Sequence, residues 1–136
     1  PFMPLHPTFY AEMLGDKMAT NAVSVWLINT GWSGGEYGVG SRIKLKYTRS
    51  MITAALNGDL NDVAYKNHTV FGLNMPVTCP NVPDELLFPK NTWKDKDAYD
   101  FKANELAKAF RANFEQFADN ANEKTLKASP KAVYNI

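Results

Sequence analysis

A glycine-dense stretch at residues 29–49 constrains this chain more than any other feature of its sequence. Five of the eight glycines lie inside it, at Gly31, Gly34, Gly35, Gly38 and Gly40. Glycine accepts backbone conformations that other residues avoid, and it lets a ligand approach the main chain closely. An apolar run precedes the stretch and an amphipathic pattern follows it, which predicts a strand, a glycine loop and a strand–helix unit. The loop is a candidate ligand site, and a glycine-rich hairpin without a ligand is the alternative.

The residues after the loop carry an alternating pattern of basic and apolar side chains. This period of two predicts a half-buried strand at residues 42–46, with Ile43 and Leu45 facing the core. The basic side chains could instead protect an exposed sheet edge. The loop itself lacks the Gly-Lys-Ser/Thr ending of a P-loop and the spacing of a dinucleotide fingerprint, so neither common nucleotide motif applies.

A second predicted helix covers residues 47–57 and ends at Gly58. Thr48 is a candidate N-terminal cap or first-turn residue. A helix N-terminus presents free N–H groups and a partial positive charge, which suit an oxygen-rich ligand. The predicted buried stripe of this helix is Met51, Ile52, Ala55 and Leu56.

Hydrophobic periodicity predicts four further elements. They are a helix at residues 8–19, a strand at 23–28 that is buried on both faces, a strand at 70–77 and a packing helix at 97–118. Four prolines between residues 76 and 89 predict an extended crossing without regular pairing. We therefore expect an α/β fold in which a mixed sheet has flanking helices.

Length and composition narrow the class of protein. A chain of 136 residues fits one domain or part of one, and a net charge of +1 gives no argument for nucleic acid or a membrane surface as partner. The lone Cys79 cannot form an internal disulfide, which fits a reducing compartment, and no signal peptide or spanning run is present. We expect a cytoplasmic protein. The start at Pro1, close to a helix, suggests a piece of a larger protein, with a processed chain as the alternative.

Few side chains are candidates for other chemistry. His6 is interpreted as a capping or packing residue rather than a metal ligand, since no second ligand type lies at a useful spacing. Cys79 has only His68 as a local base and is interpreted as structural. The last residues, 122–136, are expected to be weakly ordered unless Val133, Tyr134 and Ile136 dock.

Several motifs together resemble a known enzyme family. The longest is Asn29-Thr-Gly-Trp-Ser-Gly-Gly-x-Tyr-Gly-Val-Gly, followed by Arg42-Ile-Lys-Leu-Lys-Tyr-Thr-Arg. Others agree in order: Leu5-His-Pro-Thr-x-Tyr-Ala-Glu, Cys79-Pro-x-Val-Pro, Asn91-Thr-Trp and Asn113-Phe-x-x-Phe. This set resembles the C-terminal domain of ATP-dependent phosphoenolpyruvate carboxykinase. The resemblance covers residues 1–121 and implies part of the nucleotide-binding domain of a larger enzyme, with 122–136 as a tail.

The resemblance also implies a function. The whole enzyme converts oxaloacetate and ATP to phosphoenolpyruvate, ADP and carbon dioxide in gluconeogenesis, with Mg²⁺ and Mn²⁺. Residues of similar carboxykinases that match Arg42, Ile43 and Thr48 line the ATP site. The phosphate loop, metal ligands and oxaloacetate-binding residues lie upstream, so no catalytic residue or metal ligand is expected here, and the remainder of the enzyme chain is the expected partner.

Two other classes of function remain open from the residues alone. One is a freestanding nucleotide-binding module, and the other is a structural interaction module without catalysis. Without the resemblance, Arg42 would be interpreted as half of a surface salt bridge.

Overall fold

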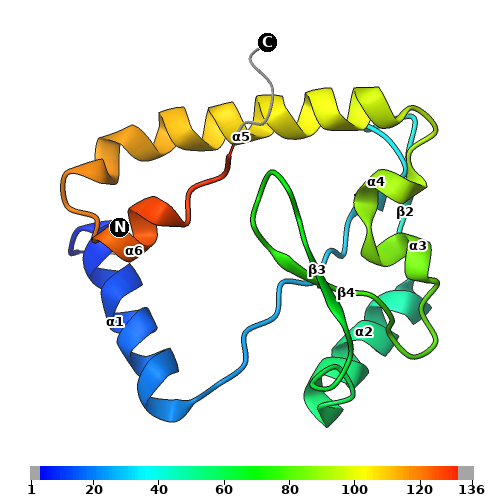
Figure 1. Ribbon diagram of the computed structural model, residues 1–136, viewed down its shortest axis with the longest axis horizontal. Coiled ribbons are helices and arrows are strands. Elements are labelled where there is room, and N and C mark those ends of the chain that lie inside the picture. Colours follow the sequence, from blue (N-terminus) through cyan, green and yellow to red (C-terminus); the bar gives the residue numbers. More distant parts are fainter. Residues whose placement is uncertain (1–3, 132–136) are drawn as a thin grey trace.

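The computed structural model describes residues 4–131 as helices and two small β hairpins (Figure 1). The elements are α1 (Pro7–Asn21), β1 (Trp32–Ser33), β2 (Ser41–Arg42), α2 (Leu45–Asn57), β3 (Tyr65–Asn67), β4 (Asn74–Pro76), α3 (Asp84–Leu87), α4 (Pro89–Thr92), α5 (Lys96–Ala118) and α6 (Glu123–Lys127). The tip of the β3–β4 hairpin points towards α5, and a long extended segment joins α1 to β1 (Figure 1). The chain is thus a small helix-and-strand assembly, but among the described residues two separate antiparallel pairs replace the expected mixed sheet.

Helix α1 confirms the predicted N-terminal helix. Pro7 occupies its first turn, and Nδ1 of His6 accepts a hydrogen bond from the backbone N–H of Thr8 at 3.4 Å. This is the capping role expected of His6. Ala22 adopts a left-handed conformation, with φ of 49°, and ends the helix. No residue of α1 is buried, and Phe9, Met13 and Leu14 of its apolar stripe are 52%, 42% and 59% exposed.

The predicted buried strand at residues 23–28 is wrong for this chain. The segment is extended, but no other strand of the described residues pairs with it. Val23, Val25 and Leu27 are 54%, 60% and 80% exposed. A strand buried on both faces needs neighbouring strands and covering layers on both sides, and residues 4–131 supply neither.

The predicted strand at residues 42–46 is also wrong beyond its first residue. Strand β2 ends at Arg42, which pairs with Trp32, and helix α2 begins at Leu45. Leu45 is 63% exposed rather than facing the core. Beyond Arg42 the chain runs back past Gly31, whose carbonyl oxygen accepts from the N–H of Ile43 at 2.9 Å, and no described residue before Gly31 pairs with it further. The backbone beyond Arg42 therefore satisfies its hydrogen bonds by forming a helix.

Helix α2 confirms the second predicted helix and starts two residues earlier. Gly58 ends it with φ of 78°. The predicted buried stripe is only partly correct, because Met51 and Ala55 pack on the core whereas Ile52 and Leu56 are 41% and 82% exposed. One side of α2 contacts the rest of the chain, and nothing described covers the other side.

The second hairpin corrects the predicted strand at residues 70–77. Only Asn74–Pro76 forms strand β4, and residues 70–73 belong to the turn, where Gly72 has φ of 66°. Downstream, the proline-rich crossing is more regular than expected, since it contains a bridge between Cys79 and Val82 and the short helices α3 and α4. Prolines at helix starts explain part of this, because Pro89 opens α4.

Helix α5 confirms the predicted long packing helix. Oδ1 of Asp95 caps it by accepting from the backbone N–H groups of Asp97 and Ala98, both at 2.9 Å. Ala103 and Ala107 are buried against Val70, so α5 covers a hairpin turn rather than a sheet. Helix α6 follows it, and Val133, Tyr134 and Ile136 lie outside the described residues.

The buried residues form two small clusters. One joins Ala54 of α2 to Leu60, Cys79 and Val82. The other is the contact of α5 with the hairpin turn described above. Small side chains dominate both clusters, so each depends on close backbone approach rather than on large buried area.

The packing of α5 on the turn of the second hairpin can be tested by mutation. Ala107 is fully buried, so Ala107→Leu should overpack the contact and lower the free energy of unfolding by about 1–3 kcal/mol. Ala112→Leu, at an exposed position of the same helix, should change it by less than about 0.5 kcal/mol. Thermal and urea unfolding of both variants measure the difference. Equal stability of the two variants would contradict the packing described here.

Candidate functional site

The glycine loop is built so that its backbone crosses itself closely. Gly34 and Gly38 have φ of 84° and 88°, a region that other residues adopt only with strain. A Cβ at Gly40 would lie 2.7 Å from the carbonyl oxygens of both Ser33 and Gly35. The loop therefore requires glycine at these positions, whether or not it binds a ligand.

Two distant motifs of the sequence meet behind this loop. The hydroxyl of Thr92 donates to the carbonyl oxygen of Pro89 at 2.7 Å, so the hydroxyl of Ser33 donates to Thr92 at 2.9 Å. Glu36, at the tip of the loop, lies 3.5 Å from Nζ of Lys102 on α5. The loop is thus attached to α4 at its base and approaches α5 at its tip.

A basic helix start follows the hairpin directly. Lys44 is the N-cap residue of α2 and provides no side-chain hydrogen bond to the first turn. The side chains of Arg42, Lys44 and Lys46 are exposed around this uncapped terminus. Free N–H groups, the helix dipole and three cations make the position suitable for an anionic or oxygen-rich ligand.

The three residues predicted to bind ATP lie where the glycine hairpin meets the start of α2, and they differ in solvent exposure. Arg42 is exposed at the end of β2 and makes no ion pair with any acidic side chain of residues 4–131. Ile43 is half-buried, and its N–H donates to the carbonyl oxygen of Gly31 at 2.9 Å. Thr48 is only 7% exposed and is the fourth residue of α2, so it is not the N-cap. Arg42 and Ile43 thus follow the loop directly, and Thr48 lies one turn further on.

A large cavity of the described residues lies elsewhere. Its volume is about 1000 Å³, and it is lined by the extended segment, by Trp32 and Ser33 of β1, and by parts of α2, the second hairpin and α5. None of Arg42, Ile43 or Thr48 lines it. Sequence reasoning did not find this cavity, and the apolar run at residues 23–28 was the signal that could have indicated it.

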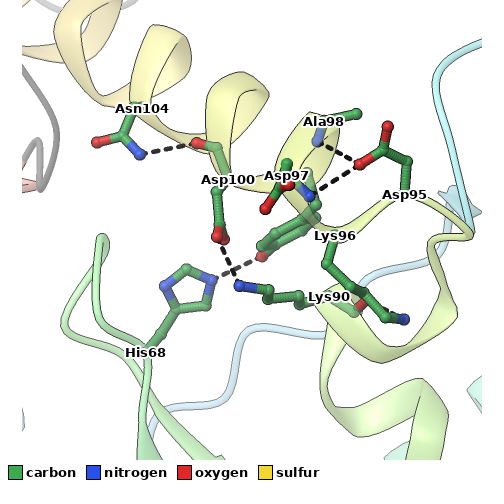
Figure 2. Close-up of polar contacts among 9 residues, drawn as sticks. His68, Lys90, Asp95, Lys96, Asp97, Ala98, Asp100 and Asn104 are labelled. Carbon is green, nitrogen blue, oxygen red and sulfur yellow. Dashed lines mark hydrogen bonds and ion pairs between the residues drawn. The ribbon is translucent and has the colours of Figure 1, made fainter. Parts of the chain in front are cut away.

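A polar contact also joins the second hairpin to α5. Nε2 of His68 lies 2.7 Å from the hydroxyl of Tyr99, and Nδ1 accepts from the backbone N–H groups of Val70 and Phe71 at 3.2 and 3.3 Å. Because Nδ1 accepts, the ring proton is on Nε2 and is donated to Tyr99. Figure 2 shows His68 facing α5, near the ion pair of Lys90 with Asp100.

The protonation of this contact follows from its surroundings. Burial lowers the pKa of His68, and the nearby carboxylate of Asp100 opposes that shift. Burial, reinforced by Asp100, raises the pKa of Tyr99. The neutral imidazole is therefore the form that caps the hairpin turn. Sequence reasoning considered His68 only as a base for Cys79 and missed this contact across 31 residues.

Cys79 confirms its structural interpretation. It is 5% exposed within the α2 cluster, and burial, followed by the charge of Asp59, raises the pKa of its thiol. A thiol that is kept protonated is a poor nucleophile.

Among residues 4–131, no group of three His, Cys, Asp or Glu side chains could hold a metal ion. No helix in the same range is long and apolar enough to cross a membrane.

Fold and site together define a helix-and-strand segment whose glycine hairpin leads into a basic helix start. Comparison with known sequences shows the family to which this segment belongs. The family model for phosphoenolpyruvate carboxykinase matches residues 1–85. The chain belongs to that family.

Individual relatives agree along almost the whole chain. A phosphoenolpyruvate carboxykinase (ATP) of Flavobacterium johnsoniae is 65% identical over 130 residues, which are 96% of this chain and 24% of the relative. The protein of the same name from Christiangramia forsetii is 61% identical over 130 residues, with the same shares. That of Brevibacillus brevis is 53% identical over 131 residues, 96% of this chain and 25% of the relative. The chain therefore spans about a quarter of the length of these relatives.

The His68 contact predicts a pH dependence of stability. The unfolded chain binds the proton near the ordinary pKa of 6.5, whereas the folded chain binds it at lower pH. The free energy of unfolding should therefore fall as the pH drops below about 6.5, until the folded-state pKa is passed. His68→Asn keeps an acceptor for the turn but cannot titrate, so the dependence between pH 7.5 and 5.5 should flatten.

Urea unfolding at several pH values measures this effect. Ala112→Leu, the exposed control substitution on α5, should keep the slope of the parent chain. A slope that survives in His68→Asn would contradict the assignment to His68.

Proposed function

We propose that this chain is the C-terminal segment of an ATP-dependent phosphoenolpyruvate carboxykinase and contributes the adenosine end of its ATP site. One observation carries the proposal: Arg42 and Ile43 follow a glycine hairpin that leads into the uncapped, basic N-terminus of α2. The relatives' names include ATP, and their identity to this chain extends through this region.

Each of the three residues has a role that its position permits. Arg42 is exposed, so its guanidinium is available to stack on the base or to donate to ribose oxygens. Ile43 offers apolar contact beside it. Thr48 offers its hydroxyl from the first turns of α2, although its low exposure restricts this to a ligand atom that approaches the helix closely.

The rest of the reaction falls to the remainder of the polypeptide. In the proposed whole enzyme, oxaloacetate is decarboxylated and phosphorylated by ATP to give phosphoenolpyruvate, ADP and carbon dioxide, in the cytoplasm. Phosphoryl transfer needs positioned cations, including the Mg²⁺ and Mn²⁺ of the proposed enzyme. The described residues do not fit such a metal site, so this segment is assigned only the nucleoside end. Residues 1–121 would form part of the nucleotide-binding domain, and 122–136 its tail.

Arg42 provides the sharpest test. A useful background is the chimera in which this chain replaces the matching quarter of the Flavobacterium johnsoniae protein. There Arg42→Ala should weaken ATP binding by roughly ten- to hundredfold, because a charge-assisted or stacked contact contributes about 1.5–3 kcal/mol. Thr48→Ala should have a smaller effect, since a neutral hydroxyl contributes about 1 kcal/mol. Calorimetric titration with ATP measures both.

The controls separate binding from folding. Arg111→Ala removes an exposed arginine of α5 and should leave ATP affinity unchanged. Oxaloacetate binding should be nearly unchanged in every variant, and thermal melting shows whether Thr48→Ala acts through stability. If Arg42→Ala and Thr48→Ala both bind ATP as the parent chimera does, this region is not the nucleotide site.

The isolated chain should have no carboxykinase activity. The physical reason is that no metal-binding group is found among residues 4–131 and that the phosphate loop and metal ligands of the proposed enzyme are expected upstream of this segment. A coupled assay for phosphoenolpyruvate from oxaloacetate and ATP measures this, with the chimera as the positive control. Turnover by the purified chain would show that phosphate and metal binding are wrongly assigned to the rest of the enzyme.

A further inference from the structure

The glycine hairpin needs support from outside itself. Each of its strands is two residues long, and an isolated pair of short strands is marginally stable in water. Arg42 makes no ion pair with any acidic side chain of residues 4–131, so the backbone of β2 decides where its side chain starts. Any contact that fixes the hairpin therefore also fixes the point from which Arg42 reaches a ligand.

Thr92 supplies such a contact through a pair of hydroxyl groups. The hydroxyl of Ser33 donates to Oγ1 of Thr92 at 2.9 Å, and Thr92 in turn donates to the carbonyl oxygen of Pro89 at 2.7 Å. The two hydroxyls are 59 positions apart in sequence and are partly buried. The Asn91-Thr-Trp motif thus reaches the glycine hairpin through its threonine.

The main chains of the two segments meet at the same place. A Cβ at Gly34 would lie 3.2 Å from the carbonyl oxygen of Thr92, so the hairpin backbone packs directly on the end of α4. Ser33 pairs across the hairpin with Ser41, the residue before Arg42. Ser33 is therefore held by Thr92 through its side chain and by the returning strand through its backbone.

The end of α4 is itself fixed. Nζ of Lys96 donates to three carbonyl oxygens there, those of Lys90, Asn91 and Trp93, at 2.9, 2.8 and 2.6 Å. These bonds satisfy carbonyl groups that a helix end leaves without partners. Lys90 also forms an ion pair with Asp100 of α5 (Figure 2). The hydroxyl that holds the hairpin thus has a fixed position relative to α5.

The contact at the tip of the hairpin is weaker by comparison. The side chains of Glu36 and Lys102 are both more than half exposed, and they approach only to 3.5 Å. Lys102 is shared with Glu105, at 3.3 Å. Exposed ion pairs of this kind contribute little, because water and salt screen them. The hydroxyl pair at the base is therefore the contact that can hold the hairpin.

We propose that Thr92 is a positioning residue of the nucleotide site, because its hydroxyl holds Ser33 and with it the hairpin that carries Arg42 and Ile43. The inference deepens the proposed function and rests on it, since ATP is the ligand whose binding is affected. Thr92 acts through Ser33 and does not touch the nucleotide. Without its hydroxyl the hairpin occupies the binding arrangement for a smaller fraction of the time, and the apparent affinity falls by that fraction.

Steady-state kinetics of the chimera with the Flavobacterium johnsoniae protein test this role. Thr92→Val removes the hydroxyl at nearly constant volume and should raise the KM for ATP about three- to tenfold, as expected for one lost hydrogen bond. The kcat and the KM for oxaloacetate should stay unchanged, because the hydroxyl contacts neither reacting group. Calorimetric titration with ATP checks that the change in KM is a change in affinity.

Three further variants separate positioning from stability. Ser33→Ala breaks the same contact from the other side and should raise the KM for ATP by a similar factor. The double variant Ser33→Ala/Thr92→Val should be no weaker than either single variant, since both remove one shared bond. Thr92→Ser keeps the hydroxyl and should retain the parent affinity.

The matched control is a threonine far from the hairpin. Thr125→Val, on α6, removes a hydroxyl contact of similar length, to Oδ1 of Asn122 at 3.0 Å. Helix α6 and strand β2 lie at opposite ends of the molecule in Figure 1, so this variant should keep the KM of the parent chimera. Thermal melting of all variants shows how far each substitution changes stability.

The outcomes distinguish this inference from the proposed function. An unchanged KM for ATP in Thr92→Val and Ser33→Ala, with weakened binding in Arg42→Ala, would overturn the role of Thr92 alone. Multiplicative effects of the two single variants, a Thr92→Ser variant as weak as Thr92→Val, or an equal rise in Thr125→Val would overturn it too. Weakened binding in Thr92→Val but not in Arg42→Ala would support the attachment and contradict only the role of Arg42. Unchanged ATP binding in all of them would overturn both.

Discussion

The crossing of the backbone at Gly40 is the contact on which the candidate site depends. A Cβ there would lie 2.7 Å from two carbonyl oxygens, so the return of the chain past Ser33 and Gly35 is possible only with glycine. That return pairs Arg42 with Trp32 and Ser41 with Ser33. Helix α2 begins at Leu45, soon after the hairpin ends. The basic Arg42, the half-buried Ile43 and the uncapped N-terminus of α2 therefore follow one another directly.

A second contact fixes the position of α5. Val70, at the turn of the β3–β4 hairpin, packs on Ala103 and Ala107, and the neutral ring of His68 caps the same turn and donates to Tyr99. The carbonyl oxygen of Val70 also accepts from the N–H of Lys131, at 2.7 Å. One short turn thus holds the longest helix and the segment after α6, without any large buried side chain.

Incomplete burial distinguishes this chain from a self-sufficient domain. The apolar stripe of α1, the outer side of α2 and one face of residues 23–28 are exposed together. Each is amphipathic or apolar in sequence, so each has the surface of a core element without its covering layer. The chain spans about a quarter of the length of the relatives it matches.

Local sequence determined the three long helices and the glycine turn. Pro7, Gly58 and Asp95 act within one turn of the helix ends they define, and glycine at positive φ requires no distant partner. The residues around Arg42 were likewise recognisable from their motif. Tertiary structure alone decided which apolar runs became strands, since strand pairing depends on neighbours far away in sequence. It also decided the contact of His68 with Tyr99, the exposure of Arg42 and the near burial of Thr48, because each follows from packing between segments that the local pattern does not encode.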